Sequence, residues 1–167
     1  MFRKNLAIFV VCFSVVVLMS VPVGAISEGQ KNAIIDNCVK IRDDLKTLQH
    51  NDSRARVYLG RYYETILTKF IMPLNVRLTE NMLSSDSFVN NQNDFAKTRT
   101  NFVVDFVEYQ KRLESLVGID CRTEPEKFYS ELKKVRTWRE TVAEDVVKLR
   151  KLVGEQMKLV DGLKEKL

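Results

Sequence analysis

Apolar residues recur at alternating steps of four and three positions along most of the chain. The longest run comprises Phe128, Leu132, Val135, Arg139, Val142, Val146, Leu149, Val153, Gln156, Val160, Leu163 and Leu167. A second run comprises Phe88, Gln92, Phe95, Arg99, Phe102, Phe106, Tyr109, Leu113 and Leu116. This spacing turns one face of an α-helix toward a partner helix and favours coiled-coil-like packing. The pattern therefore predicts an all-α, antiparallel bundle of long helices.

Helix-breaking segments divide the chain into four expected helices. Polar residues 50–53 suggest a first break, residues 84–87 form a turn, and the segment that follows Gly118 forms the third connection. Pro73 is expected to kink the second helix, because proline lacks a backbone donor and clashes with the preceding turn. In the alternative, the apolar register continues through Asp52, residues 28–83 form one helix, and the bundle has three.

The last expected helix, residues 123–164, is longer than the others. At about 1.5 Å per residue it would extend for about 60 Å. In a bundle of four helices, roughly a third of it would then project beyond its neighbours. This projection favours a rod that presents one helix face to a partner.

The first 25 residues have the composition of an export signal. Arg3 and Lys4 precede an apolar stretch, residues 6–23, and small residues follow where a signal peptidase cleaves. We therefore predict a signal peptide at residues 1–25 and a single helical-bundle domain at residues 26–167. In the alternative, residues 6–23 stay as an uncleaved membrane anchor, since they are just long enough to span a bilayer. Both interpretations place the body of the protein outside the cytoplasm.

Two cysteines, Cys38 and Cys121, lie beyond the expected export signal. An even number of cysteines in an oxidising compartment favours a disulfide. Closing so long a loop would contribute up to about 4–5 kcal/mol of stability in the chain-entropy description. Two buried free thiols are the alternative.

Charge and histidine content argue against several functional classes. Removing Arg3 and Lys4 from the 27 basic residues leaves 25 against 22 acidic residues, a net charge of +3 without a basic run. Such a balance does not favour nucleic-acid binding. His50 is the only histidine, which makes zinc, haem and Ser-His-Asp chemistry improbable. We therefore expect no catalytic residue, no metal site and no cofactor.

The segment around Tyr58, Arg61 and Tyr63 is the richest candidate contact surface. Tyrosine and arginine together are typical of interface hot spots. The alternative is that these tyrosines close the bundle edge while arginine stems cover apolar surface. Gly60, within the same segment, would allow a neighbouring helix to approach closely.

Three polar residues interrupt the apolar runs. Gln92 and Arg99 occupy stripe positions of one expected helix, and Arg139 occupies a stripe position of the next. Polar residues at such positions usually fix helix register. They are also candidate buried contacts for an anion or another polar ligand between the helices.

Two segments carry a resemblance to other proteins. Residues 52–78, DSRARVYLGRYYETILTKFIMPLNVRL, and residues 120–129, DCRTEPEKFY, resemble segments of uncharacterised small secreted helical proteins of candidate-phylum bacteria with reduced genomes. The resemblance implies a setting at the surface of a small bacterium and no activity. No site residue is transferred from it.

The sequence as a whole favours a non-enzymatic, secreted or cell-surface helical protein that acts through interaction or structure. Its expected partner is another surface protein or a second copy of the chain, with membrane contact only if residues 6–23 remain as an anchor. A bundle that binds a small ligand or lipid between its helices is the alternative.

Overall fold

The computed structural model describes residues 26–83 and 85–165, and their regular structure is entirely helical. The elements are α1 (Glu28–Asp36), α2 (Cys38–Thr65), the π-helical segment η1 (Ile66–Ile71), α3 (Met72–Glu80), α4 (Asp86–Gly118) and α5 (Pro125–Lys164). The predicted all-α bundle is therefore confirmed. The predicted signal peptide lies outside the described residues, and coiled-coil packing stays a prediction.

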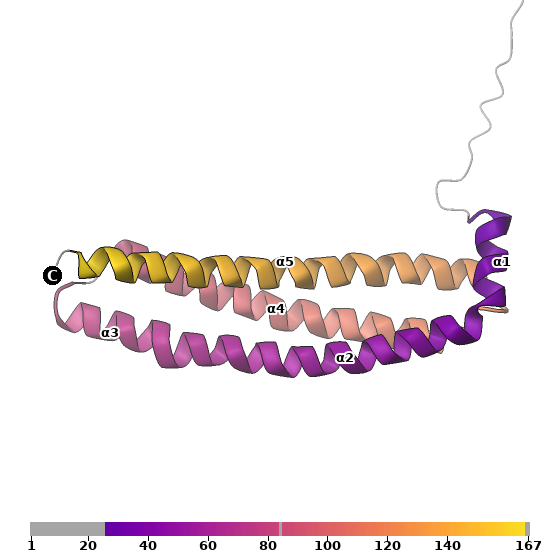
Figure 1. The fold of residues 1–167 in the computed structure, drawn as a ribbon, viewed down its shortest axis with the longest axis horizontal. Helices are drawn as coiled ribbons and strands as arrows, with labels where there is room; N and C mark the ends of the chain where they lie inside the picture. Colours follow the sequence, from indigo (N-terminus) through magenta and orange to yellow (C-terminus); the bar gives the residue numbers. More distant parts are fainter. Residues whose placement is uncertain (1–25, 84, 166–167) are drawn as a thin grey trace, which may run out of the picture.

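Three long helical arms run side by side in this bundle (Figure 1). The first arm is α2, η1 and α3, which follow one another without a break in the chain. The second arm, α4, lies antiparallel to it, and α5 returns antiparallel to α4. The short α1 lies across the end of the bundle, where Lys31 contacts Glu126 at 3.6 Å.

The break between the first two helices falls at Asn37, not at residues 50–53 as predicted. Asp52 and Ser53 resemble capping residues, but their side chains bond to α4 across the bundle. Because those bonds satisfy the polar groups, the helix continues through them. At Asn37 the side-chain amide instead donates to the Ala33 carbonyl at 2.9 Å, where the chain turns from α1 into α2.

Pro73 disturbs the helix as predicted, and the form of the disturbance is a π-helix. The segment η1 directly precedes Pro73, and the Met72 N–H donates to the carbonyl of Leu67, five residues back. A wider turn relieves the clash of the proline ring with the preceding turn. A π-helix also has more than four residues per turn, so residues four apart keep facing the same way. Tyr63, Leu67 and Ile71 are accordingly all buried.

The core lies along α4, which contacts both other arms. Its buried apolar residues are all members of the predicted run: Phe88, Phe95, Phe102, Phe106, Tyr109, Leu113 and Leu116. Asn91 and Thr98 are also buried, although each precedes by one position the residue that the run predicted. From α5, the predicted positions Phe128, Val135, Val142, Leu149 and Gln156 are buried. The period of the sequence therefore located the core faces of these two helices correctly.

The predicted disulfide joins Cys38 and Cys121, whose Cα atoms lie 5.6 Å apart. Both residues are buried. The antiparallel register of the first arm and α4 explains the match, because Asn75 meets Phe88 at the far end of the same pair of helices. The bridge thus fixes the end of the bundle where the chain enters α2 and leaves α4.

Two smaller expectations are wrong. The last helix does not project, because its end at Asp161 and Lys164 lies beside Arg77 of α3 around a common hollow. The first arm is long enough to flank it, since η1 joins α2 to α3. Gly60 marks no close approach of a neighbouring helix, because a Cβ atom there would meet no other atom within 4 Å.

Candidate interaction surface

A tier of polar side chains joins all three arms on the inward side of α2. The Tyr109 hydroxyl donates to Asp52 Oδ2 at 2.7 Å, and Arg139 Nε donates to the same oxygen at 3.1 Å. Burial and the bond to Asp52 raise the pKa of the Tyr109 hydroxyl, and the same carboxylate raises the pKa of Arg139. The tier therefore holds a neutral phenol and a charged guanidinium at neutral pH.

The polar tier continues on the neighbouring residues of α2 and α4. Gln110 Nε2 donates to Ser53 Oγ at 2.6 Å, and Arg56 Nη1 donates to Gln110 Oε1 at 3.0 Å. Ser53 in turn donates to the carbonyl of Gln49 at 2.7 Å. Each side chain has a protein partner, so the tier fixes the relative position of the helices. In the sequence, the sign of this tier was the polar segment 50–53, which had suggested a helix break instead.

The three predicted buried polar contacts pair with the first arm. Gln92 accepts a hydrogen bond from Asn75 at 2.8 Å, and Arg99 forms an ion pair with Glu64. Arg139, the partner of Asp52, was expected to be buried, but its side chain is 54% exposed. The long arginine side chain reaches Asp52 from the edge of α5, so its stripe position does not bury it. These contacts agree with the predicted role of the three residues in fixing the register between the helices.

The predicted contact residues separate into opposite sides of α2. Tyr58 is 69% exposed and Arg61 is exposed, as a contact surface requires. Tyr63 is only 1% exposed, so its assignment to that surface is wrong. Its ring instead makes edge-to-face contacts with Phe95 and Phe102 in the core. Burial also raises the pKa of the Tyr63 hydroxyl.

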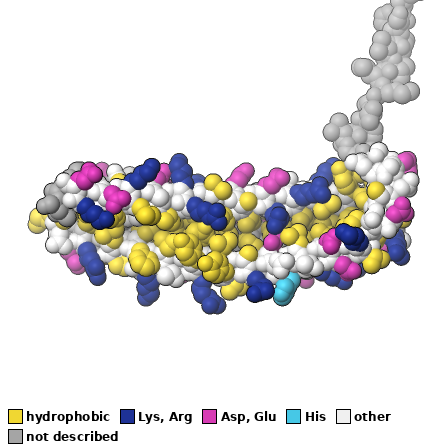
Figure 2. All heavy atoms as spheres, viewed as in Figure 1, with side chains coloured by type: hydrophobic (Ala, Val, Ile, Leu, Met, Phe, Trp, Pro, Cys, Tyr) yellow, Lys and Arg dark blue, Asp and Glu magenta, His cyan; other side chains and the backbone are white. Residues whose placement is uncertain are grey.

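The outward side of the first arm carries a continuous row of cations and aromatic rings, which we call the α2 ridge. Its cations are Arg54, Arg61, Lys69 and Arg77, all exposed. Its aromatic residues are Tyr58, Tyr62 and Phe70, also exposed. Figure 2 shows basic side chains projecting along this edge with apolar groups between them. The sequence had pointed to this segment through Tyr58 and Arg61.

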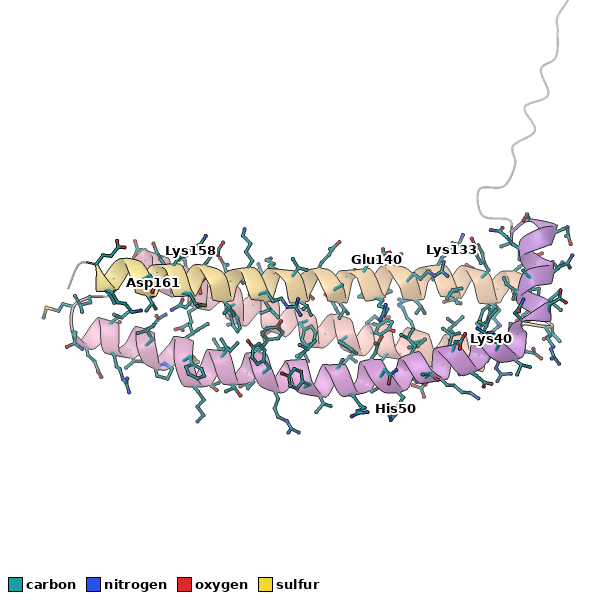
Figure 3. The ribbon with its side chains drawn as sticks, viewed as in Figure 1. Lys40, His50, Lys133, Glu140, Lys158 and Asp161 are labelled. Carbon is teal, nitrogen blue, oxygen red and sulfur yellow. A yellow bond between two sulfur atoms is a disulfide. The ribbon has the colours of Figure 1, made fainter. Side chains whose placement is uncertain are left out.

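Acidic side chains are missing from the α2 ridge. Between residues 51 and 79 the sequence has two, Asp52 and Glu64. Asp52 is bound to Arg139, and Glu64 is bound to Arg99. His50 extends the ridge, because its side chain points away from the bundle (Figure 3). The ridge therefore has no carboxylate of its own, although Asp161 of α5 lies near its α3 end, in the hollow that Lys69 and Arg77 also line.

Two ridge tyrosines are held against each other and against the core. The rings of Tyr58 and Tyr62 are stacked at 6.3 Å with an angle of 7° between their planes. Tyr62 also makes an edge contact with buried Tyr63 at 5.2 Å. Such contacts restrict side-chain rotation, so the ridge presents a fixed aromatic surface.

Two hollows open on the groove between the first arm and α5. One, of about 450 Å³, lies between η1, α3 and α5 and includes Phe70, Leu74, Met157 and Val160. The other, of about 350 Å³, lies beside Asp52, Tyr109 and Arg139. Both open to solvent, and both have the size of a small-ligand site.

Two further kinds of feature, metal sites and membrane-spanning helices, concern only the part of the chain that the structure describes. Within it, no three His, Cys, Asp or Glu side chains are grouped as a metal site would require. Among the described helices, none combines the length and the apolar character needed to cross a bilayer.

No family model, curated protein or solved structure matches the chain. The resemblance to secreted proteins of candidate-phylum bacteria therefore stays a prediction. Any functional conclusion must come from the surface itself.

Proposed function

We propose that the chain is a non-enzymatic, extracytoplasmic interaction protein that presents the α2 ridge to another component of the cell surface. The observation that supports this is the ridge itself, a fixed row of exposed aromatic rings and cations. The two carboxylates between residues 51 and 79, Asp52 and Glu64, are both paired with arginines of other helices. Aromatic residues and arginine are the side chains that contribute most to binding in protein contacts.

The proposed location follows from the disulfide and the N-terminal sequence. A buried disulfide fits an extracytoplasmic protein, because such bonds persist in oxidising compartments. The composition of residues 1–25 supports export through a signal peptide. The protein is then secreted, or is held at the surface if residues 6–23 stay uncleaved.

The proposal is tested by removing the ridge side chains and measuring binding to the envelope of the producing cells. We expect the triple variant Tyr58→Ala, Arg61→Ala and Tyr62→Ala to lose at least about 30-fold in affinity, the equivalent of one lost hot spot. Its melting temperature should hardly change, since these side chains are exposed.

A matched control removes exposed residues from the other two arms. Val104→Ala, Lys111→Ala and Val147→Ala should leave envelope binding unchanged, because all three lie off the ridge and are exposed. Equal binding by the ridge variant and the unmodified protein would contradict the proposal. Sedimentation of the free protein measures the alternative, self-association through the same ridge.

The hollow between η1, α3 and α5 favours a second candidate function, the binding of a small aliphatic ligand between helices. Phe70, Leu74, Met157 and Val160 supply its apolar surface, and Lys164 stands at one end. Calorimetry with decanoate tests this candidate. Val160→Trp should fill the hollow and abolish binding, whereas Val147→Trp, on an exposed position of α5, should not.

A further inference from the structure

We infer that the partner of the α2 ridge is the anionic headgroup layer of a lipid bilayer, on which the first arm lies lengthwise. This inference rests on the proposed function and names the chemistry of the partner. It concerns a protein lying on a membrane surface, which is consistent with no described helix being able to cross one.

The spacing of the cations is the first reason. Arg54, Arg61, Lys69 and Arg77 follow one another at intervals of seven or eight residues, about two helical turns. At about 1.5 Å per residue, the four charges extend over about 35 Å along one edge of the bundle. An anionic membrane offers negative charge along that whole length, and each lysine or arginine at its surface raises affinity about fivefold.

The side chains between the cations are the second reason. Tyr58 and Tyr62 combine an apolar ring with a polar hydroxyl, which is the composition that settles at the level of lipid headgroups. Phe70 adds an apolar ring, and Val57 and Val76 are exposed nearby. Arginine and lysine stems can extend along apolar surface while their charged ends reach the phosphates. This combination is typical of helices that lie in a membrane interface.

Shape and charge together favour a membrane over a second copy of the chain. The ridge runs along the outer edge of the bundle, and basic side chains project from that edge (Figure 2). A second copy would have to supply a matching acidic row. The exposed faces of α4 and α5 instead mix charge signs, as with Asp94 beside Lys97 and Glu144 beside Lys148.

The test measures cosedimentation of the exported protein with vesicles of phosphatidylglycerol and, separately, of phosphatidylcholine. We expect binding to the anionic vesicles, weakened by salt, and little binding to the zwitterionic ones. Arg54→Gln with Arg61→Gln should lower affinity for phosphatidylglycerol about 30-fold, and charge reversal at both positions should lower it further. Circular dichroism checks that each variant keeps its helices.

A matched pair of variants separates ridge contact from the effect of net charge. Lys97→Gln with Lys111→Gln removes the same charge from exposed positions of α4, and should leave vesicle affinity within about threefold of the starting value. Tyr58→Trp should show a blue-shifted emission on vesicles, whereas Val104→Trp should not. All variants share the same N-terminus, so any contribution from it cancels in these comparisons.

Several outcomes would overturn the inference. An equal loss of affinity in both charge pairs would show attraction by net charge alone, and unchanged vesicle binding in the ridge pair would place membrane contact elsewhere. If the protein ignores phosphatidylglycerol but binds the cell envelope through the ridge, the partner is an acidic protein or polymer. The membrane inference then fails while the proposed function survives. If ridge variants lose neither kind of binding, both fail.

Discussion

Tyr62 and Tyr63 are adjacent in the sequence, but the Tyr62 side chain lies on the outward side of α2 and the Tyr63 side chain lies on its inward side. Tyr63 is buried and packs edge-to-face on two phenylalanines of α4. Tyr62 is 47% exposed, stacks on Tyr58 and touches the core only through its edge contact with Tyr63. The comparison shows that α2 has two surfaces. The inward surface packs against the other helices, and the outward surface is not required for that packing.

The charges of the first arm divide in the same way. On the inward side, Asp52 and Glu64 each bind an arginine of another arm. On the outward side, the exposed cations Arg54 and Arg61 form no ion pair within the part of the chain that the structure describes. A surface that only keeps a protein soluble usually interleaves both signs. The separation therefore favours a binding role for the outward side.

The largest expected effect distinguishes the two tyrosines directly. Tyr63→Ala should lower the free energy of unfolding by about 3–5 kcal/mol, because it leaves a cavity against Phe95 and Phe102. Tyr62→Ala should cost less than about 1 kcal/mol, since its ring is half exposed. Urea denaturation of both variants measures this difference. Similar losses in the two variants would mean that the ridge tyrosine belongs to the core.

The next effect concerns the polar tier on the inward side. Tyr109→Phe removes the hydroxyl that donates to Asp52, and should cost about 1.5–3 kcal/mol, as for other hydrogen bonds to charged groups. Tyr58→Phe is the matched control on the ridge and should change stability by less than about 0.5 kcal/mol. Thermal unfolding of both proteins provides the measurement. A negligible cost for Tyr109→Phe would show that Arg139 alone holds the carboxylate.

The sequence predicted α4 and α5 well because their core faces follow one strict period. Phe95, Phe102 and Leu116 lie at predicted positions and are buried. The disulfide was also predictable, because the two cysteines beyond the expected export signal are an even number and disulfides form in the compartment that such a signal implies. The break at residues 50–53 was wrong, because the sequence does not show whether Asp52 bonds to its own backbone or to a distant tyrosine.

The ridge was only partly predictable, for a related physical reason. Steps of four and three place Tyr62 and Phe70 on the inward side of a regular helix, whereas both are exposed. The π-helix before Pro73 changes the number of residues per turn, so Leu67 and Ile71, four residues apart, both face inward and Phe70 is exposed. In the sequence, the apolar residues four apart and the proline that follows them were the available sign of this change. Tyr62 lies in α2 before this segment, so the π-helix does not account for its exposure.

A smaller effect is expected where the two sides of α2 meet, at Gly60. An added Cβ atom would meet nothing within 4 Å, and alanine favours helix over glycine by up to about 1 kcal/mol. Gly60→Ala should therefore raise the free energy of unfolding by about 0.5–1 kcal/mol. Vesicle binding should stay unchanged, because the methyl group adds no charge. A loss of stability in urea would reveal a packing constraint at this position.

The smallest effect depends on pH and concerns an inter-helix contact between like charges. Asp145 of α5 lies near Asp105 of α4, and its Oδ2 atom is buried without a hydrogen-bond partner. Burial first, and then the Asp105 carboxylate, raise the pKa of Asp145 to about 6. The opposite arrangement holds at Asp52, which faces Arg139.

The raised pKa fixes the sign of the pH dependence. The folded protein binds the Asp145 proton more tightly than the unfolded chain does, so stability falls as pH rises from about 4 to about 6 and stays lower above that window. Asp145→Asn should remove this penalty and raise the melting temperature at pH 7 by at most about 4 °C, with no gain at pH 4. The gain is small because Asp145 is partly exposed and solvent screens the repulsion. Asp94→Asn, at an exposed position of α4, is the control and should shift neither value. An equal gain at both pH values would mean that the asparagine acts through packing rather than through charge.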